Sequence, residues 1–236
     1  MSSIVWDGFA VTGARPVFRA FRMPGRNEVY AYEEDCSGTK LVCKFYGARF
    51  GVGLGRAALM ARREYENLNT LRRFNLVGSP HHVIRPLGRS RDINAVLAVE
   101  YYAGEEFSDS IKRAIQRGDA DHLYWRLTAL AYFLATQHTR TANGCGVDFS
   151  AECRYFDKLV TQLRNLNRVD QQDVEQLAIL RDRWRGRPAM WQDKQVWLHG
   201  DATPGNFLFG HGLDVAAIDL ERMRRGDRLF DLGRVA

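Results

Sequence analysis

The sequence predicts an α+β fold with two lobes, a small antiparallel sheet followed by a mainly helical part. Three observations support this prediction. Alternating, aromatic-rich segments bounded by turn residues occupy most of the first hundred positions, as in strands. Apolar residues at helical spacing follow, and short apolar strands return only near residue 196. We therefore expect an N-terminal lobe over residues 1–102 and a helical C-terminal lobe over residues 103–236.

The composition is that of an ordinary globular chain. Of its 236 residues, 45% are hydrophobic and 26% are charged, which is enough to bury a core. The N-terminus has no basic stretch followed by an apolar one, and no uncharged run approaches membrane-spanning length. We therefore expect a cytoplasmic protein without a membrane span.

Arginine gives the chain its basic character, since Lys and Arg outnumber Asp and Glu by 34 to 28. An arginine cluster at positions 222, 224, 225 and 228 favours an anionic partner and repels a polycationic one. A nucleic-acid-binding helical protein would also explain the arginines. However, the aromatic residues fall at strand and core spacings instead of forming an exposed stacking platform, so we expect no nucleic acid partner.

The N-terminal lobe is expected to contain one helix, over residues 56–74, and five strands. The turn between the first two strands holds a single glycine, Gly25, and is by itself a weak signal for a phosphate-binding loop. The five strands are alternating or apolar runs over residues 16–22, 28–33, 40–46, 83–87 and 95–102.

Lys44 is unusual because it lies within an apolar strand. Alternation places Val42, Lys44 and Tyr46 on one face of that strand. A lysine there can neutralise phosphates if a carboxylate fixes its direction, and Glu64 on the following helix can do so. Glu66 points about 160° away from Glu64 around the helix. The other interpretation of Lys44 is an edge-strand lysine that keeps the sheet monomeric.

The C-terminal lobe is expected to contain three helices, over residues 121–139, 153–166 and 170–184. The first carries an apolar stripe that ends in His138, and this spacing favours a packed core histidine over a catalytic one. The other two helices are amphipathic. Their apolar faces, which include Leu163, Leu180 and Trp184, are expected to face inward.

Three polar residues stand close together near the end of the chain. Asp201 follows a short apolar strand, Asn206 lies beyond a Pro-Gly turn, and Asp219 ends an apolar run. One carboxylate can orient a hydroxyl while an amide and a second carboxylate hold Mg²⁺ against a triphosphate, which is what phosphoryl transfer needs. The other interpretation is that Asp201 and Asn206 only satisfy turn amides.

The pattern His-Gly-Asp-x-x-x-x-Asn from His199, followed by Ile-Asp-x-Glu from Ile218, resembles the motif of the aminoglycoside phosphotransferase and choline kinase group. The resemblance spans nearly the whole chain and implies a protein kinase-like fold, with a nucleotide-binding N-terminal lobe and a catalytic C-terminal lobe. It also implies ATP and Mg²⁺. Members of this group commonly continue with helices that wall the acceptor site, so the chain is either a compact member or a fragment that lacks them.

The resemblance implies roles for individual residues. Asp201 would be the catalytic residue that orients the acceptor hydroxyl, and Asn206 and Asp219 would hold Mg²⁺. Lys44, fixed by Glu64, would meet the nucleotide phosphates.

Further nucleotide contacts are implied in two places. Gly25 and Asn27 belong to the loop between the first two strands, and a hinge from Glu100 to Tyr102 would meet the adenine through its backbone. His199, Asp227 and Asp231 are expected to brace the catalytic loop. Glu221 is expected to assist the metal or the acceptor.

Together these features predict an ATP-dependent kinase that moves the γ-phosphate to a hydroxyl of a small molecule, such as a sugar or an anionic metabolite. A protein kinase is a less favoured alternative, because Gly200 replaces the arginine of His-Arg-Asp, Thr203 replaces a lysine, and Asp-Leu-Glu replaces Asp-Phe-Gly. A catalytically silent nucleotide-binding or scaffolding relative would keep the fold, but every expected polar position is filled.

Overall fold

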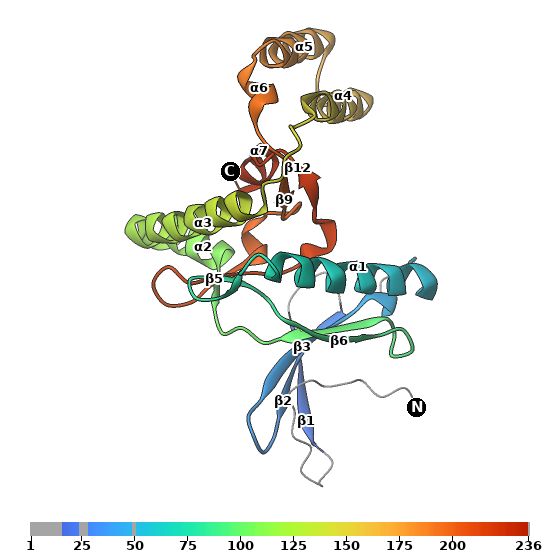
Figure 1. Cartoon of the computed structure of the whole chain (residues 1–236), viewed down its shortest axis with the longest axis vertical. Helices are drawn as coiled ribbons and strands as arrows, with labels where there is room; N and C mark the ends of the chain where they lie inside the picture. The colour runs from blue at the N-terminus through green and yellow to red at the C-terminus, as the bar shows by residue number, and fades with distance from the viewer. Residues whose placement is uncertain (1–15, 24–27, 49–50, 236) are drawn as a thin grey trace.

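The computed structural model describes residues 16–23, 28–48 and 51–235. The expected loop residues Gly25 and Asn27 lie outside these ranges. A five-stranded antiparallel sheet in the order β1-β2-β3-β7-β6 forms one end of the molecule, as Figure 1 shows, and confirms the predicted N-terminal sheet. Its strands are β1 (Phe18–Arg22), β2 (Glu28–Glu34), β3 (Lys40–Phe45), β6 (Pro86–Ser90) and β7 (Val96–Glu100).

The predicted strand over residues 83–87 is wrong in its extent, because the structure divides this segment between two sheets. Val83 ends β5 (His81–Val83), which belongs to a second sheet, whereas Pro86 begins β6. Proline has no backbone N–H and is tolerated at the first residue of a strand, so the change of sheet falls at this position.

The second sheet joins segments that are far apart in the sequence. Its order is β4-β5-β11-β10-β8, with β5 parallel to β11 and the other pairs antiparallel. Residues 81–83 therefore pair with a strand of the C-terminal half, and residues 77–78 extend this sheet by pairing with β5. Its other strands are β4 (Val77–Gly78), β8 (Glu105–Glu106), β10 (Phe207–Phe209) and β11 (Val215–Ala217), and a separate antiparallel pair is formed by β9 (Val196–Leu198) and β12 (Arg224–Gly226).

Helix α1 (Leu54–Arg72) lies between the first sheet and the helical half of the molecule (Figure 1). Val42 and Tyr46 pack in the main core with it, whereas Leu41 and Cys43 belong to a small cluster on the opposite face of β3, as strand alternation predicts. The buried residues of α1 recur at three- and four-residue spacing and include one charged side chain: Ala57, Ala61, Glu64, Leu68 and Leu71.

Helix α3 (Ala120–Thr141) is central to the C-terminal half and follows α2 (Phe107–Arg117). Its buried residues include Leu130, Leu134 and His138, which confirms the predicted stripe and the place of His138 in the core. In the described part of the chain, no helix combines the length and apolar character needed to cross a membrane.

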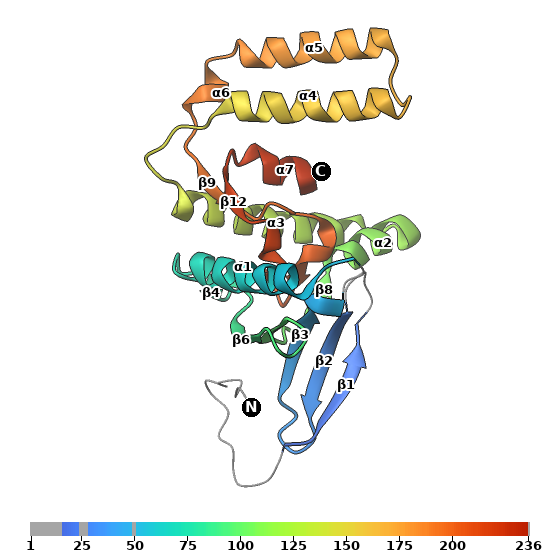
Figure 2. The same cartoon turned by 90° about the vertical axis from the view of Figure 1, so that its right-hand side faces the viewer.

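Helices α4 (Phe149–Asn165) and α5 (Gln171–Arg185) form an antiparallel pair at the end of the molecule opposite the first sheet (Figure 2). The expectation that their apolar faces are buried is wrong for several residues. Leu163, Leu180 and Trp184 are 40%, 45% and 43% exposed, and α5 has no buried residue. The reason is that a pair of helices standing away from the body buries only the sides that the two helices present to each other.

Candidate active site

The polar loop (residues 199–206) leaves β9 through a conformation that only glycine adopts easily. Gly200 has a φ of +80°, in the left-handed region. A Cβ at this position would lie 2.7 Å from the carbonyl carbon of Arg222. Gly200 therefore both turns the chain and lets the short 3₁₀ helix η3 (Leu220–Arg222) approach the polar loop.

Asp231 holds the first residues of the polar loop. Its carboxylate is completely buried and accepts the backbone N–H groups of His199 at 2.8 Å and Gly200 at 3.0 Å. Nε2 of His138 lies 3.0 Å from the same carboxylate. Because Asp231 belongs to α7 (Leu229–Val235) and His138 to α3, two helices fix the start of the loop.

Asp227 does not brace the polar loop, which corrects the sequence interpretation. Its carboxylate accepts the backbone N–H of Leu229 at 2.9 Å, at the first turn of α7. This is the contact of a helix-capping residue. Asp227 therefore positions the start of α7, the helix that carries Asp231.

The imidazole of His199 joins the polar loop to the strand that precedes Asp219. Its Nε2 lies 2.9 Å from the carbonyl oxygen of Ile218, and its Nδ1 lies 3.4 Å from the backbone nitrogen of Asp201. Burial lowers the pKa of His199, so the ring is neutral at neutral pH. We assign the proton to Nε2, because a carbonyl can only accept it and Nδ1 then accepts from Asp201.

Asn206 is fixed by the loop that carries Asp201. Its Nδ2 donates to the carbonyl oxygen of Asp201 at 2.7 Å, and its backbone N–H donates to Thr203 at 2.9 Å. Its own carbonyl accepts from the backbone N–H of Ile218 at 3.1 Å. Asn206 thus makes the turn contacts that the alternative interpretation requires, while its side-chain oxygen remains the atom suited to a cation.

Asp219 has a left-handed backbone conformation, with φ 63° and ψ 54°. This conformation costs a residue other than glycine about 1 kcal/mol or more and is concentrated at functional sites. Oδ1 of Asp219 lies 3.2 Å from Nζ of Lys44 on β3. Asp219 therefore contacts the first sheet through Lys44.

Lys44 and Glu64 form a buried ion pair, with Nζ and Oε1 2.6 Å apart. Tyr46 donates its hydroxyl to the other oxygen of Glu64. Burial acts to lower the pKa of Lys44, but the carboxylates of Glu64 and Asp219 outweigh it and raise the pKa, so the lysine stays protonated. The alternative carboxylate, Glu66, is exposed and pairs with Arg62 at 2.7 Å.

The site offers oxygen donors suited to a hard divalent cation. One carboxylate oxygen each from Glu64, Asp219 and Glu221 lie within 4.8 Å of one another. Glu64 is completely buried and lies 2.6 Å from Lys44, whereas Asp219 and Glu221 are only partly buried and are therefore the more accessible acids for a cation. Asn206 adds an amide oxygen. Carboxylate and amide oxygens are the ligands that Mg²⁺ takes, so the donor set fits this ion.

A cleft of about 340 Å³ brings most of the predicted site residues together. Lys44, Glu64, Asn206 and Asp219 line one part of it, and Glu100 to Tyr102 line another. The remaining lining is largely apolar and comes from both halves of the chain: Met23, Val29, Val42, Ile84, Val99, Glu106, Gly205, Leu208 and Ile218. A larger hollow of about 530 Å³ lies along α1 alone and contains none of the predicted site residues.

The side chain of Glu100 has a structural role that the sequence does not reveal. It lies 2.6 Å from Nε2 of His82 and accepts the backbone N–H of Arg85 at 2.5 Å. The Tyr102 ring stacks on His82 at 5.7 Å between centroids. The backbone N–H of Glu100 donates to the carbonyl of Arg85, so any base would meet other backbone groups of the 100–102 segment.

Asp201, the predicted catalytic residue, is not among the residues that line the cleft. Its Oδ1 accepts a hydrogen bond from Nη2 of Arg234, and its Oδ2 lies 3.9 Å from Nε of Arg222. Arg234 could not be identified from the sequence, because nothing in the local sequence shows that α7 returns to the polar loop.

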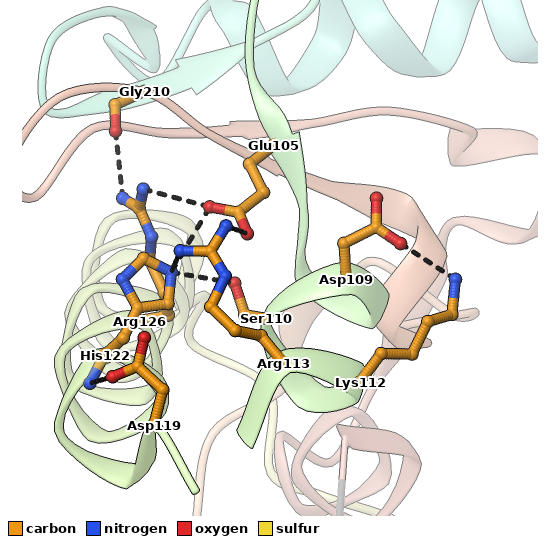
Figure 3. A network of polar contacts seen from close by, with 9 residues as sticks. All are labelled: Glu105, Asp109, Ser110, Lys112, Arg113, Asp119, His122, Arg126 and Gly210. Carbon is orange, nitrogen blue, oxygen red and sulfur yellow. Dashed lines mark hydrogen bonds and ion pairs between the residues drawn. The ribbon is translucent and has the colours of Figure 1, made fainter. Parts of the chain in front are cut away.

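A network of charged side chains fixes the segment that follows the 100–102 segment (Figure 3). Glu105 accepts from Arg113 at 2.8 Å, lies 3.2 Å from Nε2 of His122 and pairs with Arg126 at 3.4 Å. Arg126 also donates to the carbonyl of Gly210 at 2.9 Å. The network therefore ties the start of the C-terminal half to the end of β10, the strand that directly follows Asn206.

This fold and site define a class of protein. An antiparallel sheet carries the lysine, a helix carries its carboxylate partner, and a helical half carries the polar loop, which is the arrangement of protein kinase-like phosphotransferases. Residues 19–236 match the phosphotransferase enzyme family, and the chain belongs to this family. No curated protein sequence matches it.

Solved structures share the fold at low sequence identity. The macrolide 2′-phosphotransferase MphH of Brachybacterium faecium is 15% identical with a TM-score of 0.59, and the match covers 93% of this chain and 71% of that one. The ternary complex of APH(2″)-IIa with streptomycin and ATP is 16% identical (TM-score 0.53, 91% and 69% covered). The choline kinase LicA of Streptococcus pneumoniae is 17% identical (TM-score 0.52, 93% and 68% covered).

Proposed function

We propose that the chain is an ATP-dependent small-molecule kinase that transfers the γ-phosphate to a hydroxyl group, acts in the cytoplasm and requires Mg²⁺. Residues 1–102 would form the nucleotide-binding lobe and residues 103–236 the catalytic lobe. The observation that carries the proposal is the position of Lys44, whose Nζ lies 2.6 Å from Glu64 and 3.2 Å from Asp219 at the wall of the cleft. One fixed cation beside a cation-binding carboxylate suits a charged polyphosphate.

Each polar residue of the site would have its own role in the reaction. Lys44, directed by Glu64, would bind the nucleotide phosphates, and the apolar cleft lining would take the base. Asp219 and Asn206, assisted by Glu221, would hold Mg²⁺, which when bound neutralises charge on the phosphates. Asp201 would orient the acceptor hydroxyl and take its proton, as an O–P bond forms and the bond between the γ-phosphorus and the bridging oxygen breaks.

Positioning and charge would supply most of the catalysis, because phosphoryl transfer has a loose transition state and needs little activation of the nucleophile. The polar loop supports this role, since its backbone is fixed by Asp231 and by the ring of His199. The relatives named for streptomycin, macrolide and choline chemistry suggest a small-molecule acceptor. The same likeness favours a small-molecule acceptor over a protein acceptor.

The test is thermal unfolding of the chain with and without Mg²⁺-ATP, beside the variant Asp219→Asn. A ligand at one hundred times its dissociation constant stabilises the folded state by about 2.7 kcal/mol. We expect a shift of the unfolding midpoint that needs both Mg²⁺ and Asp219, and none with ATP in the presence of a chelator. An unshifted wild type would contradict the proposal.

The catalytically silent alternative is separated by a second measurement. A nucleotide-binding scaffold would show the same thermal shift but would release no ADP from ATP with any hydroxyl compound. We expect the wild type to release ADP in an acceptor screen, and Asp201→Ala to keep the Mg²⁺-ATP shift while it loses turnover.

A further inference from the structure

Two arginines from different elements converge on Asp201. Arg222 lies on η3, with its Nε 3.9 Å from Oδ2, and Arg234 lies on α7 and donates to Oδ1. Their side chains are 62% and 42% exposed, whereas that of Asp201 is 23% exposed. The pair therefore lies at the surface, outside the buried ion pair of Lys44.

The neighbouring arginines have structural contacts elsewhere. Arg224 lies 4.3 Å from the ring centroid of Phe230, and Arg225 donates to the carbonyl of Thr141 at 2.5 Å. Arg228 pairs with Asp193 at 2.6 Å. Of the four arginines in the basic cluster, Arg222 is the one with a described contact to the polar loop, and Arg234 of α7 joins it there.

The contacts of these two arginines with Asp201 are easily exchanged. An exposed ion pair contributes only about 0–1 kcal/mol, so an incoming anion can replace the carboxylate with little loss of stability. The contacts are also compatible with the proposed chemistry, because Oδ2 of Asp201 lies 3.9 Å from Nε of Arg222, beyond hydrogen-bond distance, and can accept a hydroxyl while Oδ1 accepts from Arg234. A guanidinium is a planar fork of donors that suits carboxylate and phosphate groups.

We infer that Arg222 and Arg234 bind an oxyanion group of the acceptor, and so select hydroxyl compounds that carry negative charge. The inference rests on the proposed function and names its substrate class. The two arginines and Asp201 together carry a net charge of +1 in this state, so a polycationic acceptor would meet two cations beside the carboxylate it needs. An oxyanion of the acceptor would contact the two guanidinium groups while its hydroxyl meets the carboxylate of Asp201.

The test is binding of matched small molecules to the full chain, measured by calorimetry in the presence and in the absence of Mg²⁺ and a nonhydrolysable ATP analogue. The probes are glycerol 3-phosphate and glycerate, which carry the two kinds of oxyanion, and glycerol, which carries none. We expect each anionic probe to bind wild type at least tenfold more tightly than glycerol does. An equal affinity for all three probes would overturn the inference.

The variant Arg222→Gln/Arg234→Gln should lose at least tenfold in affinity for the two anions and keep its affinity for glycerol. Arg222→Lys/Arg234→Lys, which keeps the charge, should recover part of the loss. The control is Arg183→Gln, an exposed arginine on α5 that should change nothing. Unchanged anion binding in the double glutamine variant would refute the assignment of these two residues.

Failure of the proposed function would be visible separately. The Mg²⁺-ATP thermal shift reports on Lys44 and Asp219, and the double glutamine variant should retain it. If the wild type shows no such shift, the kinase proposal is refuted. The calorimetric titration of the anionic probes without nucleotide would then still show whether the two arginines bind an oxyanion. Loss of the Mg²⁺-ATP thermal shift in Arg222→Gln/Arg234→Gln would contradict the assignment of these arginines to the acceptor rather than to the nucleotide.

Discussion

The carboxylate of Asp231 lies 3.0 Å from Nε2 of His138, although 93 residues separate them in the sequence. Both side chains are buried, and the same carboxylate accepts two backbone N–H groups of the polar loop. The position of the loop that carries Asp201 thus depends on one acid in the core.

Replacing this acid should be costly. Asp231→Ala leaves two buried N–H groups without an acceptor and His138 without its partner, and we expect a loss of roughly 3–5 kcal/mol in the free energy of unfolding. Asp227→Ala removes only the cap of α7 and should cost about 0.5–2 kcal/mol. Urea denaturation compares the two variants. Similar losses in both would show that Asp231 does not hold the loop in this way.

Gly200 should not tolerate a side chain. Alanine would be strained at a φ of +80° and would overlap the backbone of Arg222, so Gly200→Ala should cost more than about 3 kcal/mol or displace the polar loop. Gly212→Ala provides the control, because Gly212 also has a positive φ, +60°, but its Cβ would meet open space. This variant should lose only about 1–2 kcal/mol, measured in the same unfolding experiment. An equal loss in both would mean that the overlap is relieved without cost.

The ion pair of Lys44 and Glu64 could be predicted because each residue breaks a local pattern. Lys44 interrupts an apolar strand, and Glu64 occupies an apolar position of a helix stripe, so period and spacing place them face to face. The antiparallel sheet and the helix that covers it follow from the same periodicities. The spacing of Asp201, Asn206 and Asp219 could be recognised for a similar reason, since short strands and a turn separate them.

Other features depend on where distant elements meet, which no local pattern contains. Arg234 contacts Asp201 because α7 folds back beside the polar loop. The sequence around Asp227 suggests an acid that braces the loop, but in the structure α7 begins two residues later and Asp227 accepts a hydrogen bond from its first residue. The exposed face of α5 could not be foreseen either. An amphipathic pattern shows which side of a helix is apolar, but not whether another layer covers it.

His199 should make stability depend on pH. Burial lowers its pKa in the folded state, whereas an unfolded imidazole has a pKa near 6.5. Below about pH 6.5 the unfolded chain takes up a proton that the folded chain does not, so stability decreases as pH falls, by at most about 1.4 kcal/mol per pH unit from this group. Denaturation of wild type and His199→Gln at pH 7.5 and 5.5 measures the effect. The advantage of wild type should shrink at pH 5.5, and a constant difference would contradict the assignment.

Arg126 should stabilise the junction between the 100–102 segment and β10. Its guanidinium contacts Glu105 and the carbonyl of Gly210, and its side chain is 12% exposed. Arg126→Met keeps much of the apolar bulk but loses these hydrogen bonds, so we expect a loss of about 2–3 kcal/mol in unfolding free energy. Arg113→Met, at a 37% exposed position with contacts to Glu105 at 2.8 Å and to His122 at 3.4 Å, should lose about 1 kcal/mol or less. A reversed order of the two variants would contradict this interpretation of the network.

Glu64 should control the affinity for nucleotide through the position of Lys44. Glu64→Gln keeps the shape of the side chain but removes the charge that holds Nζ of Lys44 at 2.6 Å, so the lysine is left with Asp219 as its carboxylate partner among the described residues. A lysine drawn toward the cation-binding acid is less available to phosphates, and we expect Mg²⁺-ATP affinity to fall at least tenfold, measured by titration calorimetry. Glu66→Gln on the exposed side of α1 is the matched control and should bind as wild type does. If both variants bind equally well, the direction of Lys44 is set by β3 alone, and the buried pair serves the packing of α1 rather than the nucleotide.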